Sequence, residues 1–389
     1  GSVVLVWNNE VGMLYFGESE SITLDALAQF NQEKDSSALT SDAFMEQESL
    51  DADLSLFVNY SSISDLTSAM GGQFGEQVEN AQDSYKNYEA AGTTVLFDDE
   101  QVIMESQIYL KDGIDEESIQ MTAADGVAEN DLNLFAPENP KGFVLVNLAL
   151  KNLVPMWEPY LKDMDLTQQD FLDAFTGQIG LSFMGVKEQQ VISIKEEYLF
   201  EEWDLLSEEE PPVILVQDTS YELLPIFKVR MAVKNKNALV KLLESAMGEP
   251  MDSLRNENGY YVLNESEFPM FMKVGDDSFE MVSNKDFFGK SNTNWDSELA
   301  SFASSQPGTF YLNLNYQMYP DLTKEMGRDF DQMRPFLDML KDVRGTMSGM
   351  NSHFEINFTE SKDPILYRFM LAVNDAYVRN RPMKEVSEN

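Results

Sequence analysis

Clusters of acidic residues are the side chains in this sequence best suited to chemistry. Carboxylate oxygens are the ligands that hard cations such as Ca²⁺ prefer. Five candidates for a cation site lie at two predicted turns, and they are Asp112, Asp115, Glu116, Asp276 and Asp277. None of them fits the D-x-[DN]-x-[DN]-G pattern of a calcium loop, and charged turns are usually just solvated. We therefore expect no cofactor, with Ca²⁺ as the one ion that these acids would suit.

Motifs for catalysis and nucleotide binding fail on inspection. His353 is the only histidine, and it falls on the polar face of a predicted strand, which favours a hydrogen-bonded structural role. No G-x-S-x-G nucleophile motif occurs, because 345–349 has the sequence GTMSG. Gly289–Ser291 has the sequence GKS, but Asn284 stands where a phosphate loop needs glycine. We expect no catalytic residues, and a hydrolase with dispersed carboxylates is the alternative.

The elements that would position such residues are clearest in Gly308–Asp375. Hydrophobic periodicity there predicts a strand, a helical segment interrupted by Pro335, and two antiparallel strands joined by a short turn. The expected elements are Thr309–Asn315, Met326–Leu340, Phe354–Phe358 and Tyr367–Val373.

Two earlier parts of the chain show the same order of elements. The first has a strand at Leu54–Tyr60, helices at Ser61–Met70 and Val78–Tyr88, and strands at Thr93–Phe97 and Val102–Leu110. The second has a strand at Phe143–Leu148, helices at Leu153–Met164 and Thr167–Phe175, strands at Gln178–Met184 and Phe227–Val233, and a further helix at Asn237–Met247. We therefore predict an α+β fold of duplicated units, each a strand, helices and an antiparallel strand pair, with the helices packed on mainly antiparallel sheets.

This repetition predicts the domain organisation. Residues 3–50, which include a hairpin at Val3–Phe16 and a helix at Ser21–Gln32, are expected to be the tail of a truncated N-terminal unit. Three repeat units follow at 51–135, 141–290 and 308–379, and a polar tail occupies 380–389. The second repeat unit carries a charged insertion near 187–224. Gly1–Ser2 looks like an expression scar, and the strand that starts at Val3 favours a missing upstream segment.

Charge bounds the class of partner. The 389 residues include 68 acidic and 27 basic side chains, for a net charge of −41. Self-repulsion on this scale favours a monomer, and it excludes nucleic acid as a partner, because phosphates need Lys and Arg. A cationic partner fits. No apolar run approaches the roughly 20 residues of a membrane span, and the absence of cysteine excludes disulfides and thiol chemistry.

Two segments carry a resemblance to a known family. Gly142–Gly185 and Gly308–Asp375, with their VNL and LNL strands and proline-broken helices, resemble the DUF4836 family, uncharacterised proteins of Bacteroidetes that are commonly lipoproteins. The resemblance implies an extracytoplasmic protein, in the periplasm or on the outer-membrane surface, with a lipid anchor on a segment upstream of this sequence. The family brings no catalytic residues to transfer.

These observations together predict a non-enzymatic binding or scaffold protein of the cell envelope. It would act through its acidic surface and exposed sheet edges, by strand addition or by capture of a basic protein partner. A hydrolase and a calcium-dependent adhesion module are the alternatives.

Overall fold

The computed structural model describes residues 2–7, 12–17, 42–60, 86–136, 139–198, 213–264, 270–291, 295–320 and 333–379. Its contacts divide the chain into two compact units. Compact unit 1 comprises Gly1–Phe97, Val102–Glu116 and Met350–His353, and compact unit 2 comprises Asp98–Gln101, Glu117–Gly349 and Phe354–Asn389. Each is described by itself below.

Compact unit 1 is built from two groups of antiparallel strands. β1 (Ser2–Trp7) and β2 (Gly12–Gly17) form a hairpin, which confirms the hairpin predicted there. β3 (Leu54–Asn59), β4 (Tyr88–Phe97) and β5 (Gln101–Leu110) pair in chain order, and α2 (Asp42–Glu48) packs on them through Phe44, whose ring lies 5.3 Å from that of Phe57. The helices predicted at Ser21–Gln32 and Ser61–Met70 lie outside the described residues, as does most of the one predicted at Val78–Tyr88. At the end of that last range, 86–87 form a turn and Tyr88 begins β4.

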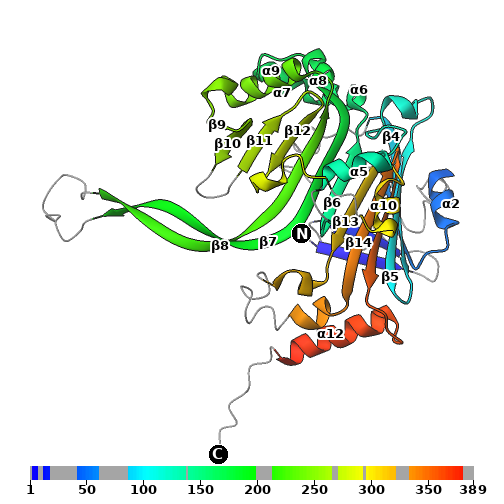
Figure 1. Cartoon of the computed structure of the whole chain (residues 1–389). Helices are drawn as coiled ribbons and strands as arrows, with labels where there is room; N and C mark the ends of the chain where they lie inside the picture. The colour runs from blue at the N-terminus through cyan, green and yellow to red at the C-terminus, as the bar shows by residue number, and fades with distance from the viewer. Residues whose placement is uncertain are drawn as a thin grey trace, which may run out of the picture. The chain divides into compact units, whose positions relative to one another are not determined.

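Compact unit 2 holds the remaining strands and most of the helices (Figure 1). The strands are β6 (Gly142–Asn147), β7 (Phe175–Tyr198), β8 (Val213–Val233), β9 (Asn256–Glu257), β10 (Tyr260–Asn264), β11 (Met270–Val274), β12 (Ser278–Val282), β13 (Gly308–Asn313), β14 (Leu340–Ser348) and most of β15 (Asn351–Phe358). The helices are α5 (Glu129–Phe135), α6 (Leu150–Leu153), α7 (Glu158–Asp163), α8 (Gln168–Ala174), α9 (Lys236–Met247), α10 (Ser297–Ala303) and α12 (Ile365–Arg379). Short 3₁₀ turns are η3 (Glu116–Ser118), η4 (Val154–Trp157), η6 (Met251–Ser253), η7 (Lys285–Phe287) and η8 (Tyr316–Met318).

Strand pairing overturns the predicted fold class. Thirteen strands form one antiparallel sheet in the order β3-β4-β5-β15-β14-β13-β6-β7-β8-β12-β11-β10-β9. The fold is therefore largely sheet, and the α+β prediction of helix-packed units is wrong. The physical reason is visible at β6 and β13, the first strands of two expected repeat units, which pair with each other from Gly308↔Val146 to Leu312↔Gly142. Periodicity identifies single strands, but it does not say which edges pair.

The order of elements nevertheless recurs. β3, β6 and β13 each pair with the first strand of the hairpin that follows, namely β4, β7 and β14. The duplication itself stays a prediction.

The C-terminal segment corrects a second expectation. Tyr367–Val373 was expected as a strand, and it lies in α12. Within 365–375, the part of this helix whose side chains are described, Ile365 and Ala372, two turns apart, are buried, whereas the other large apolar side chains are exposed. The run is almost continuously apolar and fits both periods, so alternation alone could not decide. The strand pair of this region is β14 and β15, and β14 begins at Leu340, where a helix was expected to end.

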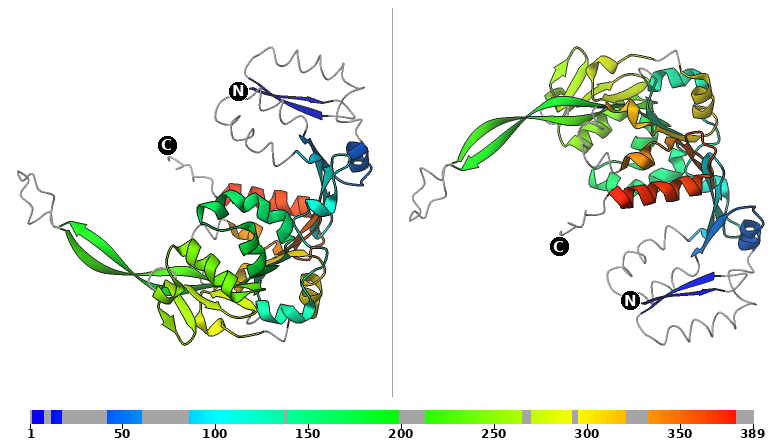
Figure 2. Two further views of the ribbon diagram at one scale, coloured as in Figure 1. Left: turned by 90° about the horizontal axis from the view of Figure 1, so that it is seen from above. Right: turned by 90° about the horizontal axis from the view of Figure 1, so that it is seen from below.

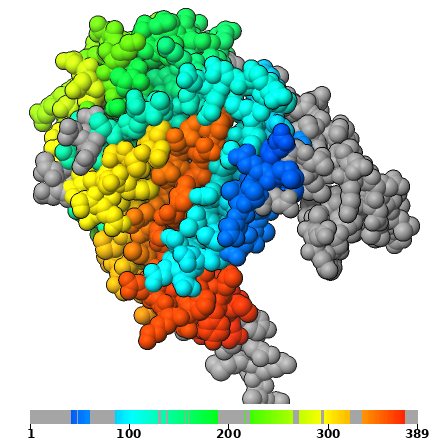
Figure 3. Space-filling model, turned by 90° about the vertical axis from the view of Figure 1, so that its right-hand side faces the viewer, coloured from blue at the N-terminus to red at the C-terminus, as the bar shows by residue number. Residues whose placement is uncertain are grey.

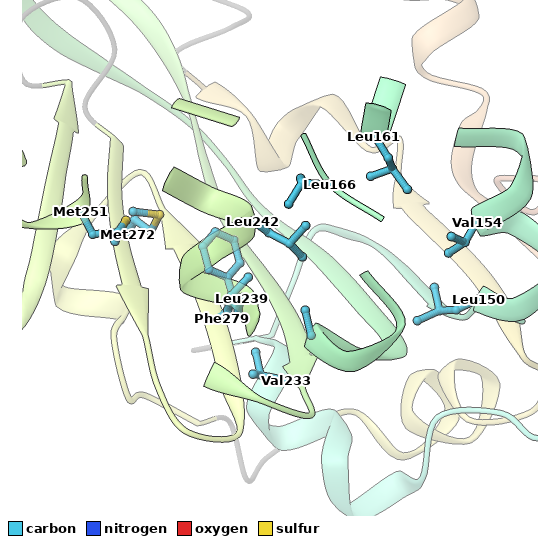
Figure 4. Packing of buried hydrophobic residues seen from close by; sticks show 11 residues of the cluster. Leu150, Val154, Leu161, Leu166, Val233, Leu239, Leu242, Met251, Met272 and Phe279 are labelled. Carbon is cyan, nitrogen blue, oxygen red and sulfur yellow. The ribbon is translucent and has the colours of Figure 1, made fainter. Parts of the chain in front are cut away.

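Two cores cover opposite faces of the sheet in compact unit 2. In β8, Met231 and Val233 face the larger core, in which Leu239 and Leu242 of α9 pack near Phe279 of β12 (Figure 4). The alternate residues of β8 face the other way, where α5 and α10 form a smaller core. Its members include Leu132, Phe135, Phe143, Leu145, Ala300, Ala303 and Tyr311. Period two in the strands thus supplies both faces.

Gly180 is the point at which α5 meets the sheet. A Cβ there would lie 2.0 Å from Cδ1 of Phe135 and 2.8 Å from Cδ2 of Leu145. We expect Gly180→Ala to lower the free energy of unfolding by roughly 1–3 kcal/mol through overpacking, measured by urea unfolding. In a Phe135→Leu background, which makes room, the same change should cost less. Equal costs in both backgrounds would contradict this packing.

A capping box starts α8. Thr167 accepts a hydrogen bond from the Asp170 backbone N–H, and the Asp170 carboxylate accepts from Thr167 and from Lys241 Nζ at 2.7 Å. The Lys241 hydrogen bond, followed by those of Thr167, holds the pKa of Asp170 below its usual 3.8. The stability that this carboxylate contributes is therefore present above about pH 4 and is lost as the pH falls through the lower pKa of the folded state.

We expect the stability difference between the wild type and Asp170→Asn to shrink below pH 4, measured by urea unfolding at pH 6 and pH 3. Thr167→Ala should cost about 1 kcal/mol at pH 6, because it removes the cap. Parallel pH curves for the wild type and Asp170→Asn would contradict the assignment.

Candidate functional site

The outer part of β7 and β8 is the most prominent candidate for an interaction site. β6 pairs with β7 over Gln178–Phe183, and β12 pairs with β8 over Lys228–Ala232. Beyond these ranges β7 and β8 continue to pair with each other, from Gly185↔Ile226 to Tyr198↔Val213. We call Gly185–Tyr198 and Val213–Ile226 the arm. At about 3.3 Å per residue it is roughly 45 Å long, and it extends away from the other strands of compact unit 2 in three views (Figures 1 and 2).

A β-bulge marks the root of the arm. The register shifts between Phe183 and Gly185 on β7. Gly185 has a φ of +121°, a backbone angle that residues with a side chain rarely adopt. One step further along, Val186 pairs with Pro225. A bulge bends a strand and increases its twist. The arm therefore leaves the sheet at the line where the neighbouring strands stop pairing.

Side chains just before β6 and just after η8 hold this root in place. The ring of Phe183 stacks on Tyr319 with centroids 6.1 Å apart, and Lys141 Nζ lies 5.2 Å from the Tyr319 ring centroid. Lys141 Nζ also donates to Met318 O at 2.6 Å, and Tyr319 donates to Asn313 O at 2.5 Å. Burial raises the pKa of Tyr319 to about 12, so its hydroxyl remains a donor across the physiological range. These contacts fix the root from which the arm extends.

The two outer edges of the arm are the features that could bind a partner. Within the described part of the chain, neither of its strands has a further hydrogen-bonded strand on its outer side. An exposed strand edge presents N–H and C=O groups in a row, which is a template for another strand. The arm therefore offers two such edges.

Negative charge also distinguishes the arm and the segment that joins its strands. Residues 187–224 contain eleven acidic and two basic residues, a net charge of −9. In the register of the arm, Tyr221 pairs with Gln190. The side chain of Tyr221 is 66% exposed. The charged insertion expected near 187–224 is thus a long ribbon, apart from 199–212, which lie outside the described residues.

The predicted cation ligands do not gather into a cluster. Asp112, Asp115 and Glu116 follow β5, and Asp276 and Asp277 form the turn between β11 and β12. Asp276 pairs with Lys236 at 3.2 Å, and Asp277 accepts a hydrogen bond from Ser278 Oγ at 3.2 Å. Over the ranges that the structure describes, no group of three or more potential ligands could hold a metal. Calcium binding stays a prediction.

Buried carboxylates bear on the hydrolase alternative. Glu280 and Asp342 are the two buried acids among the described residues. Glu280 lies 2.8 Å from Lys228 Nζ, and Asp342 accepts hydrogen bonds from Arg344 Nε at 3.1 Å and Asn357 Nδ2 at 2.9 Å. Each is held by a cation rather than set beside a second carboxylate, which gives no geometry for paired acid–base catalysis.

His353 occupies the kind of position predicted for it. It lies on β15 with Nδ1 3.3 Å from Glu105 Oε1. This contact fits a structural role.

Two other surfaces expose apolar side chains. On β3, Leu54, Leu56 and Val58 alternate and are exposed. On α12 the exposed side chains lie at the surface of compact unit 2, where Figure 3 shows the helix in red, and they include Leu366, Tyr367, Phe369, Met370, Leu371 and Val373. Nothing in the structure identifies what would cover either surface.

Sequence reasoning missed the arm as an ordered element. The signal was present, since Val186–Tyr198 and Val213–Leu224 are rich in β-branched and aromatic residues that favour strands. Because the stretch between these two segments is strongly acidic, we predicted a charged insertion rather than a pair of strands.

Comparisons with known proteins add no assignment. No helix among the described residues is long and apolar enough to cross a membrane. No family model, curated protein or solved structure matches the chain. The resemblance to the DUF4836 family, and the envelope location and lipid anchor that it implies, stay predictions.

Proposed function

We propose that the protein is a non-enzymatic binding protein that captures an extended basic segment of a partner protein on the arm by strand addition. The observation that carries the proposal is the pair of strand edges along the arm, which have no further strand beside them in the described residues. Strand addition uses main-chain hydrogen bonds for affinity and alternate side chains for specificity.

The arm suits this mode because it is already ordered by its own register. Two strands pair continuously from Gly185↔Ile226 to Tyr198↔Val213, so the partner segment is the part that must lose conformational freedom on binding. A two-stranded ribbon is marginal alone. A third strand added at an edge would contribute further main-chain hydrogen bonds.

Charge selects the partner. A net charge of −9 over 187–224 repels acidic segments and attracts basic ones. Such steering speeds encounter and weakens as salt increases. Placing this activity in the cell envelope rests on the resemblance alone, and there the protein would act as a lipid-anchored adaptor.

The arm should be separable from the fold. In an arm-shortened variant, Asn-Gly replaces residues 188–223 and joins Lys187 to Leu224, which face each other in the register. Because the removed strands pair only with each other among the described residues, the thermal midpoint should move by less than about 2 °C. Differential scanning calorimetry measures this shift, and a large loss of stability would show that the arm supports the core.

Strand addition can be tested with peptides of fixed charge. We expect a fluorescein-labelled octapeptide of alternating Lys and Val to bind the full chain, measured by anisotropy, and to bind the arm-shortened variant at least tenfold more weakly. N-methylation of alternate residues removes the N–H donors on one edge of the peptide and keeps its charge. One N-methylated series should therefore lose binding, and the complementary series should keep it.

Two outcomes would overturn the proposal. Equal binding of the parent peptide to the full chain and the arm-shortened variant would place the site elsewhere. Equal binding of both N-methylated series would show that charge alone, and not a strand edge, holds the peptide.

A further inference from the structure

A cavity of about 230 Å³ opens beside β8, β11 and β12 in compact unit 2. Its charged lining comes from several elements: Arg230 on β8, Lys273 on β11, Glu280 on β12, Asp277 in the turn between β11 and β12, and Lys290 just after η7. Three of these residues lie in one row across the sheet, because Lys273 faces Glu280 and Glu280 faces Arg230 in the register. Backbone pairing therefore fixes their spacing.

The lining reverses the charge balance of the chain. Three cations and two carboxylates line the cavity, whereas acidic residues outnumber basic ones 68 to 27 overall. One of the two carboxylates is already engaged. Oε1 of Glu280 lies 2.8 Å from the buried Nζ of Lys228, and Oε2 accepts the Gly289 N–H at 3.4 Å. The cavity therefore has an excess of positive charge.

Arg230 has donors that the protein does not use. Its side chain is 9% exposed, and its Nε lies 3.8 Å from Glu280 Oε1, which is too long for a hydrogen bond. One face of its guanidinium lies 5.6 Å from the Phe135 ring. In the described part of the chain, its two terminal nitrogens make no hydrogen bond to another residue. Neither nitrogen is among the buried polar atoms that lack a partner, and Arg230 lines the cavity, so these donors are accessible to an acceptor there.

We propose that this cavity binds a small organic anion through one oxyanion group, a carboxylate or a phosphate. Arg230 provides the planar pair of donors that matches two oxygens of such a group. Lys273 and Lys290 add charge at the exposed rim, and Leu134 supplies an apolar contact. The volume limits the ligand to a small metabolite rather than a drug-sized molecule.

This inference is independent of the arm. The cavity lies on β8, β11 and β12, and none of its lining residues belongs to Gly185–Tyr198 or Val213–Ile226. The arm-shortened variant should therefore bind the anion as the full chain does. A failure of strand addition would leave the cavity proposal standing, and the reverse also holds.

Titration calorimetry with inorganic phosphate and with acetate, at fixed ionic strength, tests the site. We expect saturable binding of at least one of the two, and the preferred probe identifies the oxyanion class. Arg230→Lys keeps the charge but loses the planar fork, so the dissociation constant should rise at least tenfold. Lys273→Gln, at an exposed position, should weaken binding several-fold. Lys362→Gln removes one charge from an exposed turn and should have no effect.

The outcomes that overturn the proposal are distinct. Absence of saturable binding for both probes in the wild type would exclude an oxyanion site. Unchanged binding in Arg230→Lys would exclude Arg230 as the anchor. Equal weakening of anion binding by Lys273→Gln and Lys362→Gln would show that binding depends only on the net charge of the protein and not on this cavity. If Arg230→Lys fails to fold, the comparison of Lys273→Gln with Lys362→Gln decides alone.

Discussion

The hydrogen bonding between β7 and β8 is the interaction on which compact unit 2 depends. One pair of strands lies in the interior of the sheet, between β6 and β12, and then continues as the arm. Two packed faces fix the register inside the sheet, and the bulge between Phe183 and Gly185 shifts it by one residue before it continues outside. The core and the bulge together therefore set the register of the arm.

The same pairing explains why charged residues are buried in the sheet. One face of β8 packs on the larger hydrophobic core, so every second residue of the strand lies on the opposite face. Lys228 and Arg230 are two of these residues, and both are buried. Burial lowers the pKa of Lys228, and the hydrogen bond and charge of Glu280 oppose that effect. The pair thus neutralises two groups that the register forces inside. Arg230 lies next to this pair and lines the cavity.

How far the sequence predicts this structure depends on the range of the interaction. Local signals succeeded: the β1–β2 hairpin, the inner β7–β8 pair and α9 all occur where they were expected. Long-range pairing was not predictable, because nothing local in β6 specifies β13 as its neighbour. α12 failed for a different reason, since an almost continuous apolar run satisfies both periods.

The functional sites follow the same division. The acidity of 187–224 was visible in the sequence, and it is the basis for the proposed basic partner. The basic cavity was not visible, because Lys273, Glu280 and Arg230 become neighbours only through the pairing of β11, β12 and β8. In a chain with a net charge of −41, an anion approaching at random meets repulsion over most of the surface. A site for a small anion must therefore be a sheltered cavity whose cations are held by the backbone, and a site for a basic segment is best carried on an exposed acidic arm. β8 takes part in both proposed sites, since its Arg230 lines the cavity and its residues 213–226 belong to the arm.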